Sequence, residues 1–304
     1  MLESKLKNYL QLHFIVFLWG FTAILGALIT IDAIPLVWFR MLLAVLFIGI
    51  YFLIKKKSFL IDKKTTLKFI LTGIIIAIHW ITFFKAIKVS NVSVALVTMS
   101  TGAFFASFIE PFFFKRRIKF LEIFLGLLVI IGLYIIFNFE SQYYLGIIYA
   151  LISAFLAALF SVLNGVFVKK HSAEIISFYQ LLFGALFITI YLLFKNKFSV
   201  AFFNLSALDW IFLLVLSSIC TAYAFIVSVK VMKVISPFTV VLTVNLEPIY
   251  AIILALIIFG EKEKMNPEFY YGALLVFLVV LLNAFLKNKT ILRKRLSKKT
   301  VHKN

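Results

Sequence analysis

The sequence predicts an all-α membrane protein with ten transmembrane helices arranged as two inverted five-helix repeats. Hydrophobic residues fill 64% of its 304 positions, mean hydropathy is +1.11, and only 14% of the residues are charged. The charges gather in short clusters that separate apolar runs of about 20 residues, the length of a helix that spans the ~30 Å hydrocarbon core of a bilayer. In addition, the two halves of the chain show a weak similarity that falls in the same order.

Five apolar runs make up the first half, with expected bounds 10–30, 35–54, 67–87, 93–114 and 120–138. They are apolar on all sides, which favours helices over the alternating strands of a membrane barrel. The first run follows two lysines and resembles a signal peptide. Because no small-residue cleavage site closes it and nine more runs follow, we expect an uncleaved first helix.

The second half repeats this organisation, with runs expected at 144–168, 175–194, 208–229, 237–259 and 268–286. The connections are too short to fold as separate domains, so nothing outside the membrane is large enough to form a soluble enzyme. We therefore predict a first repeat at 1–140, a second at 141–287 and a basic tail at 288–304. The tail lacks interleaved aromatic residues, which indicates contact with anionic headgroups and no binding of nucleic acid.

Lys and Arg residues are distributed unequally between alternate connections. If the N-terminus is cytoplasmic, 24 of them lie at cytoplasmic ends of the runs and only six at the outer ends. Cytoplasmic connections of membrane proteins carry the excess of positive residues. The sequence therefore predicts a multi-pass protein with both termini in the cytoplasm, and the net charge of +19 is explained by membrane orientation.

The similarity between the halves consists of short matching segments. Lys85-Ala-Ile-Lys88 recurs 145 positions later as Lys230-Val-Met-Lys233, and Trp38-Phe39-Arg40 matches Phe178-Tyr179-Gln180. Glu110-Pro111 resembles Glu247-Pro248 but lies eight residues out of register. Since each half has an odd number of runs, the second copy inserts upside down. Inverted repeats of this kind build transporters that alternate around a central site, so the pattern favours a carrier.

Three short motifs give the chain a resemblance to a known family. Trp19-Gly20-Phe21, Glu247-Pro248 and Phe259-Gly260-Glu261 resemble the EamA-type members of the drug/metabolite transporter superfamily over most of the chain. The resemblance implies a ten-helix carrier of the bacterial inner (plasma) membrane that exports amino acids or related metabolites. The first half departs from the family pattern, because Ala103 replaces the expected Pro and Lys115-Arg116 replaces Gly-Glu.

Glu247 is the most informative polar residue inside an apolar run. An ionisable group near the membrane centre is costly, so it needs a partner, water or a function. Asn245 lies beside it, and Pro248 frees a backbone carbonyl one turn earlier. The carboxylate either contacts a substrate amine or a coupled proton, or it supports the proline kink structurally.

Further candidates lie in both halves. Arg40 either clamps a substrate carboxylate, snorkels outward or pairs with Asp32. His79 and Trp80 lie at the depth of a carrier's cavity, although a buried His also serves as an interhelical hydrogen-bonding group. The predicted cavity residues are Arg40, His79, Trp80, Asn164, Tyr179, Gln180, Tyr223, Asn245 and Glu247.

Other polar residues are expected to be structural. We predict a salt bridge of Glu110 with the basic cluster that follows it, a snorkelling Lys85, and a packing role for Cys220, the single cysteine. The sequence offers no metal-ligand spacing, no phosphate-binding loop and no nucleophile motif, so we expect no cofactor and no catalytic residues.

The leading functional hypothesis is a secondary transporter for a small polar metabolite, coupled to protons, to a counter-solute or to neither. The first alternative is an integral-membrane enzyme that acts on lipid, with His79 and Glu247 as acid and base. The second is a membrane scaffold, which would leave the inverted repeat unexplained. The substrate, the direction of transport and the oligomeric state are left open by the sequence.

Overall fold

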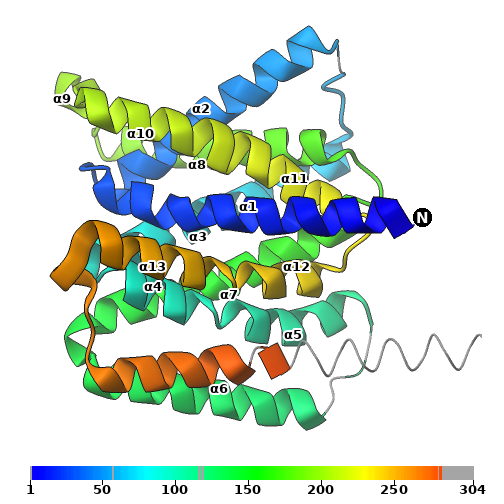
Figure 1. The fold of residues 1–304 in the computed structure, drawn as a ribbon. Helices are drawn as coiled ribbons and strands as arrows, with labels where there is room; N and C mark the ends of the chain where they lie inside the picture. The colour runs from blue at the N-terminus through cyan, green and yellow to red at the C-terminus, as the bar shows by residue number, and fades with distance from the viewer. Residues whose placement is uncertain (1, 57, 116, 118–119, 280, 283–304) are drawn as a thin grey trace, which may run out of the picture.

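The protein is helical throughout the part of the chain that the structure describes, which comprises residues 2–56, 58–115, 117, 120–279 and 281–282 of a computed structural model (Figure 1). The helices of the first half are α1 (Leu2–Leu28), α2 (Ala33–Ile54), α3 (Lys63–Val89), α4 (Val92–Met99), α5 (Gly102–Phe113) and α6 (Phe120–Phe139). Those of the second half are α7 (Tyr144–Phe167), α8 (Ala173–Phe194), α9 (Val200–Phe203), α10 (Ala207–Ser217), α11 (Ala224–Val231), α12 (Pro237–Val244), α13 (Glu247–Phe259) and a last helix, Pro267–Val279.

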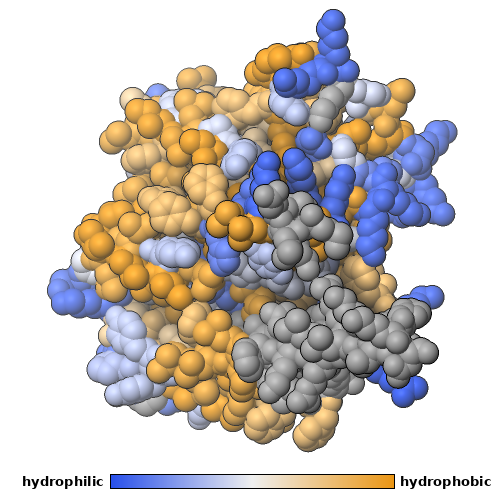
Figure 2. Space-filling view, turned by 45° about the vertical axis from the view of Figure 1, so that its right-hand side comes forward, coloured by the Kyte–Doolittle hydropathy of each residue, from blue (hydrophilic) through white to orange (hydrophobic). Residues whose placement is uncertain are grey.

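Eight helical segments in these ranges are long and apolar enough to cross a membrane. Two shorter apolar helices, Phe124–Ile136 and Pro267–Val279, fall within the fifth and tenth predicted runs. Large apolar side chains such as Ile257 and Tyr271 are exposed on the flanks, and Figure 2 shows hydrophobic residues covering much of the visible surface. The protein is therefore a multi-pass membrane protein. The first helix begins at Leu2, earlier than predicted, and continues as one helix through residue 28.

The two ends of the bundle differ in charge. We call the end with the connections 55–62, 114–119, 168–172 and 232–236 the basic end, and the end with the connections 29–32, 90–91, 140–143, 195–206 and 260–266 the far end. The N-terminus lies at the basic end (Figure 1). In Figure 2, which turns that side forward, hydrophilic residues gather there.

Short polar residues begin several of the helices. The Asp62 carboxylate accepts a hydrogen bond from Thr65 N at 3.0 Å, and the Asn91 side chain accepts one from Val94 N at 2.8 Å. Ser236 caps α12 in the same way through Thr239 N at 3.2 Å. Such caps satisfy backbone N–H groups that have no partner within the helix, and they explain where the apolar segments begin.

The fourth and ninth predicted runs are each broken in the middle, whereas the sequence predicted continuous helices. α4 gives way to α5 at Ser100 and Thr101, and α12 gives way to α13 at Asn245 and Leu246. The second break is favoured by Pro248, which has no N–H to donate to the carbonyl of the preceding turn. The first break forms without a proline.

These breaks agree with the offset of 145 residues between the Lys85 and Lys230 segments of the sequence. α4 and α12 begin 145 residues apart, and so do α5 and α13. At this offset the counterpart of Glu247 is Gly102, and the counterpart of Pro248 is Ala103. Glu110 and Glu247 are therefore not equivalent positions, in agreement with the eight-residue mismatch of their motifs in the sequence.

The helix ends also correspond between the halves. α2 and α8 both have 22 residues and begin 140 positions apart, and each is followed by a residue with positive φ, Lys56 at 48° and Asn196 at 47°. Lys115 and Gly260, which follow the broken helices, have φ of 50° and 57°. The replacement of Gly-Glu by Lys115-Arg116 therefore leaves a positive φ at the same position, although a lysine there is strained relative to glycine.

The two broken helices lie side by side, with α4 packed on α13 and α5 packed on α12. α3 packs along α7 and α8, and it comes closest to α8 where Gly73 faces Gly184. A side chain at residue 73 would meet the Gln180 carbonyl at 2.5 Å. These packings surround a cavity in the middle of the bundle.

Candidate functional site

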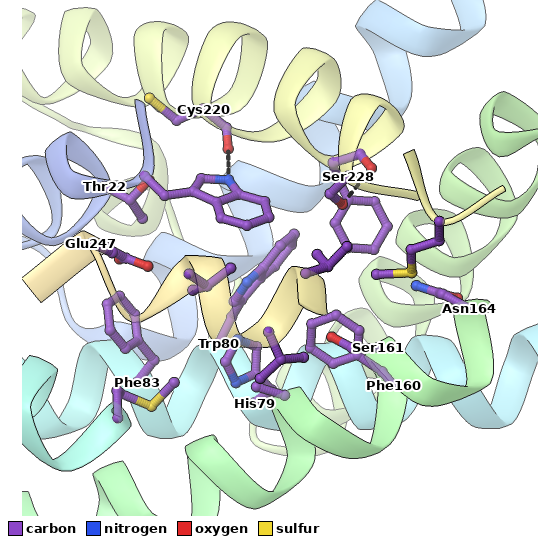
Figure 3. A pocket seen from close by; sticks show the side chains of 18 of the residues that line it. Thr22, His79, Trp80, Phe83, Phe160, Ser161, Asn164, Cys220, Ser228 and Glu247 are labelled. Atoms are coloured by element: carbon purple, nitrogen blue, oxygen red, sulfur yellow. Dashed lines mark hydrogen bonds between the residues drawn. The ribbon is translucent and has the colours of Figure 1, made fainter. Parts of the chain in front are cut away.

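The central cavity has a volume of about 110 Å³ and lies where the two halves meet. Residues of α1, α2, α3, α4, α7, α11, α12, α13 and the π-helical turn Ser218–Tyr223 line it. Five of the nine predicted site residues line it, namely Arg40, His79, Trp80, Asn164 and Glu247. In Figure 3 the Trp80 ring projects into the middle, with Glu247 to one side and Asn164 to the other. Arg40, His79 and Trp80 come from the first half, and Asn164 and Glu247 from the second.

Arg40 is buried and held firmly at the cavity. Only 2% of its surface is exposed, its Nε donates to Thr221 Oγ1 at 2.6 Å, and its guanidinium carbon lies 3.9 Å from the centre of the Trp80 ring. Nη1 has no hydrogen-bond partner in the structure. The snorkelling interpretation is therefore wrong, and so is the pairing with Asp32. A buried guanidinium with a free N–H is a strong donor toward a carboxylate or phosphate.

Glu247 is the first residue of α13, where the helix dipole favours a negative charge. Its side chain is half-buried and lines the same cavity as Arg40. The opposite charges attract each other across the cavity, yet no hydrogen bond or ion pair joins the two side chains. The cavity thus separates a cationic group of the first half from a carboxylate of the second.

His79 links two helices as well as lining the cavity. Its Nδ1 lies 2.9 Å from the Ser153 carbonyl oxygen, and Ser153 Oγ donates to the His79 carbonyl at 2.9 Å. These bonds join α3 to α7 and fix the orientation of the imidazole. Nε2 is the ring nitrogen left available to the cavity. His79 thus both lines the cavity and bonds α3 to α7, whereas its contact with a substrate or a proton stays a prediction.

Asn164 and Gln180 form a polar pair of which only one member reaches the cavity. Gln180 is completely buried behind Asn164 and donates from Nε2 to Asn164 Oδ1 at 2.7 Å. Asn164 Nδ2 has no partner in the structure. Gln180, the counterpart of Arg40 in α8, thus positions a cavity residue without lining the cavity itself.

Three predicted residues lie elsewhere. Tyr179 donates its hydroxyl to the Phe59 carbonyl at the basic end. Tyr223 is 43% exposed and contacts Phe14 on the outer surface of the bundle. Asn245 is buried at the break between α12 and α13 and does not line the cavity.

Glu110 and Lys85, to which the sequence analysis assigned structural roles, both contact other parts of the protein. Glu110 Oε1 accepts a hydrogen bond from Phe238 N at 3.4 Å, a contact that the sequence did not predict. Lys85 is half-buried and lines a second cavity of about 320 Å³ near the far end.

Several cavity residues were not predicted. Trp19 lines the cavity and donates from Nε1 to the Cys220 carbonyl at 3.1 Å. Cys220 is buried, as predicted, but it also lines the cavity, as do Thr22, Ser161 and Ser228. The break in α-helical structure at Ser218–Tyr223, where a π-helical turn joins α10 to α11, turns Thr221 toward Arg40. Single hydroxyls in apolar runs gave no signal that distinguished them from helix-packing residues.

Comparison with known proteins establishes the family. The model of the EamA-like transporter family matches residues 7–138 and 144–285. The chain belongs to the EamA-like transporter family. These two matched ranges are two EamA-like repeats, and the resemblance noted from the sequence is confirmed.

Solved structures support the fold of this EamA-like protein. One crystal structure of a protein superposes with a TM-score of 0.66 at 13% identity, and the match covers 95% of this chain and 99% of that chain. No curated protein sequence matches the chain. Within the described residues, no group of three His, Cys, Asp or Glu side chains is placed to hold a metal ion.

Proposed function

We propose that this EamA-like protein is a secondary transporter that exports a small zwitterionic metabolite, such as an amino acid, by alternating access. The observation that carries the proposal is the placement of Arg40 and Glu247. They face one small cavity from different repeats, with opposite charges and without a direct bond. A zwitterion bound between them would match both charges at once.

The cavity chemistry supports this substrate class. Arg40 presents an unpartnered Nη1 to a carboxylate, and Glu247 accepts an ammonium group. The rings of Trp19 and Trp80 add apolar faces that also attract cations. A volume of about 110 Å³ is below the ~300–1,000 Å³ of pockets for drug-sized ligands, which favours a small metabolite.

The proposed mechanism needs ten transmembrane helices in two inverted repeats, at 1–140 and 141–287. The helix starts repeat at offsets of 140 to 147 residues, and the breaks in the fourth and ninth segments occupy equivalent positions. Broken helices at mid-membrane frame the binding sites of many carriers that work by rocking one repeat against the other. These observations support the proposal for this chain.

For the orientation, we place the basic end and both termini in the cytoplasm, in a bacterial inner membrane. The excess of Lys and Arg at that end supports this placement. The carrier needs only its substrate, the bilayer and a coupling proton or counter-solute. An enzymatic role for His79 and Glu247 gains no support, since His79 Nδ1 is engaged with Ser153.

The test is transport in reconstituted vesicles by Glu247→Gln, which keeps size and hydrogen bonding but removes the charge. We expect uptake of radiolabelled amino acids to fall at least tenfold, with expression and folding retained. Glu268→Gln, at a glutamate outside the cavity, is the matched control and should transport as the wild type does. Normal transport by Glu247→Gln between pH 5 and 8 would make Glu247 structural and remove the zwitterion proposal.

A further inference from the structure

Two carboxylates occupy reciprocal positions at the two ends of the bundle. Glu263, which follows α13, reaches the beginning of α4 at the far end. Its Oε1 accepts from Val92 N at 2.9 Å, and its Oε2 accepts from Ser93 N at 2.9 Å and Ser93 Oγ at 2.8 Å. Glu110, near the end of α5, reaches the beginning of α12 at the basic end, where it accepts from Phe238 N at 3.4 Å. Each broken helix pair therefore caps the other.

The two helix starts differ in the donors that they offer, for a reason that the sequence makes plain. At the offset of 145 residues, Pro237 stands where Val92 does and Phe238 where Ser93 does. Proline has no N–H and phenylalanine has no hydroxyl, so the basic end lacks two of the three donors that Glu263 uses. Glu263 is also 4% exposed, and such a buried, charge-assisted contact is among the stronger hydrogen bonds of a protein.

Two further buried carboxylates connect the halves at the far end. Asp209 accepts from Thr30 N at 2.8 Å and Thr30 Oγ1 at 2.7 Å, and Glu140 accepts from Asn266 N at 2.9 Å. The central cavity has the opposite bias. It extends from Arg40 and Glu247 toward residues near the basic end, such as Met232 and Asn164. Buried carboxylates thus join the two halves at the far end, on the opposite side of Arg40 and Glu247 from Met232 and Asn164.

We propose that Glu263 with the N-terminus of α4, and Glu110 with the N-terminus of α12, are the two gates of the transport cycle. The proposal rests on the proposed function and concerns how access to that same site is controlled. The far gate is closed here and holds the resting protein open toward the basic end. When the repeats rock, the bonds of Glu263 break and the contact of Glu110 shortens. The missing donors at Pro237 and Phe238 make the outward-open state the less stable one.

The reporter for this proposal is Ser161→Cys in a Cys220→Ser background, called the wild type below, because Ser161 lines the cavity. Cys220 itself is unsuitable, since it is only 2% exposed and its Sγ donates to Leu18 O at 3.6 Å. A charged, membrane-impermeant methanethiosulfonate is applied to right-side-out and to inside-out vesicles, with Cys220→Ser as the blank. We expect wild-type labelling from the basic end and little from the far end. Glu263→Gln combined with Ser93→Ala should raise labelling from the far end at least tenfold.

Matched variants sharpen the test. Glu261→Gln changes an exposed glutamate that pairs with Lys264 in the same turn, and it should leave labelling unchanged. Adding Glu110→Gln to the double variant should lower far-end labelling at least threefold, because the outward-open state then loses its own gate. Ser93→Ala alone removes one of three bonds and should give an increase of about threefold. This last variant serves if the double variant fails to fold.

Far-end labelling of the double variant within twofold of the wild type, with basic-end labelling retained, would overturn the proposal. So would a wild type that is not labelled from the basic end, or an unchanged Ser93→Ala. Labelling needs no substrate, so it separates the two proposals. If no amino acid is transported but the labelling responds as stated, the gates stand and the proposed function fails.

Discussion

The crossing of α3 and α8 at Gly73 is expected to tolerate no side chain. A Cβ at residue 73 would lie 2.5 Å from the Gln180 carbonyl oxygen and 3.0 Å from Gly184 N. Both are backbone atoms, so a whole helix must move to relieve the contact. Gly49, in the long helix α2, is a matched control, because its nearest neighbour would be a Phe178 ring carbon at 3.7 Å.

The magnitude follows from two opposing effects. Overpacking costs about 1–3 kcal/mol, whereas alanine is favoured over glycine inside a helix by roughly 0.5–1 kcal/mol. Gly73→Ala should therefore destabilise the protein by about 1–2 kcal/mol, and Gly49→Ala should stabilise it slightly. Separation of α3 from α8 would also displace His79 and Asn164, so substrate binding should weaken in Gly73→Ala only.

The assay is thermal unfolding in detergent micelles followed by circular dichroism, with ligand binding measured on the same samples. We expect Gly73→Ala to melt below the wild type and Gly49→Ala to melt at or above it. A Gly73→Ala protein as stable as Gly49→Ala would refute the close packing of α3 on α8.

Two further predictions concern carboxylates outside the cavity. Asp209→Ala should destabilise the protein by about 3 kcal/mol, because it removes two hydrogen bonds that Thr30 donates to a buried carboxylate. Asp32→Ala, at an exposed carboxylate without a cap bond, should change stability by less than about 0.5 kcal/mol. Equal melting points for the two variants would contradict this prediction. Hydrogen bonds from Thr65 hold the pKa of Asp62 below its usual value. The carboxylate therefore contributes stability above about pH 4, and this contribution is lost as the pH falls through the folded-state pKa. Asp62→Asn should weaken the acid dependence of unfolding, and an unchanged pH profile would count against the cap.

The sequence predicted how deep a polar residue lies along its helix better than it predicted which face of the helix carries that residue. Arg40, His79 and Glu247 were placed correctly because a polar group in an apolar run is costly wherever it points. Tyr223 has a similar depth but faces outward, and the nearly uniform apolarity of these runs gives no sign of which face meets the cavity. Tyr179 was missed for a different reason, because it lies near the start of α8 at the basic end, where its hydroxyl reaches the Phe59 carbonyl.

The breaks in the fourth and ninth runs were a second feature that the sequence did not predict. Pro248 marks one break, but the first half breaks at Ser100 and Thr101 without a proline, so only its correspondence to the second half could have revealed it. The offset of 145 residues between the Lys85 and Lys230 segments gives that correspondence, but it does not by itself show that the helix breaks there. The contact of Glu263 with α4 joins residues about 170 positions apart, a distance over which local patterns carry no information.

The central claim, that the cavity binds a zwitterion between Arg40 and Glu247, is tested most directly by binding of matched ligands to the purified protein. The amino acid that gives the largest thermal shift is compared with its amide, which lacks the carboxylate, and with its N-acetyl form, which lacks the ammonium group. We predict that each analogue binds at least tenfold more weakly, and that Arg40→Gln abolishes the difference between the amino acid and its amide. Equal binding of all three ligands, or no shift with any amino acid, would contradict the account.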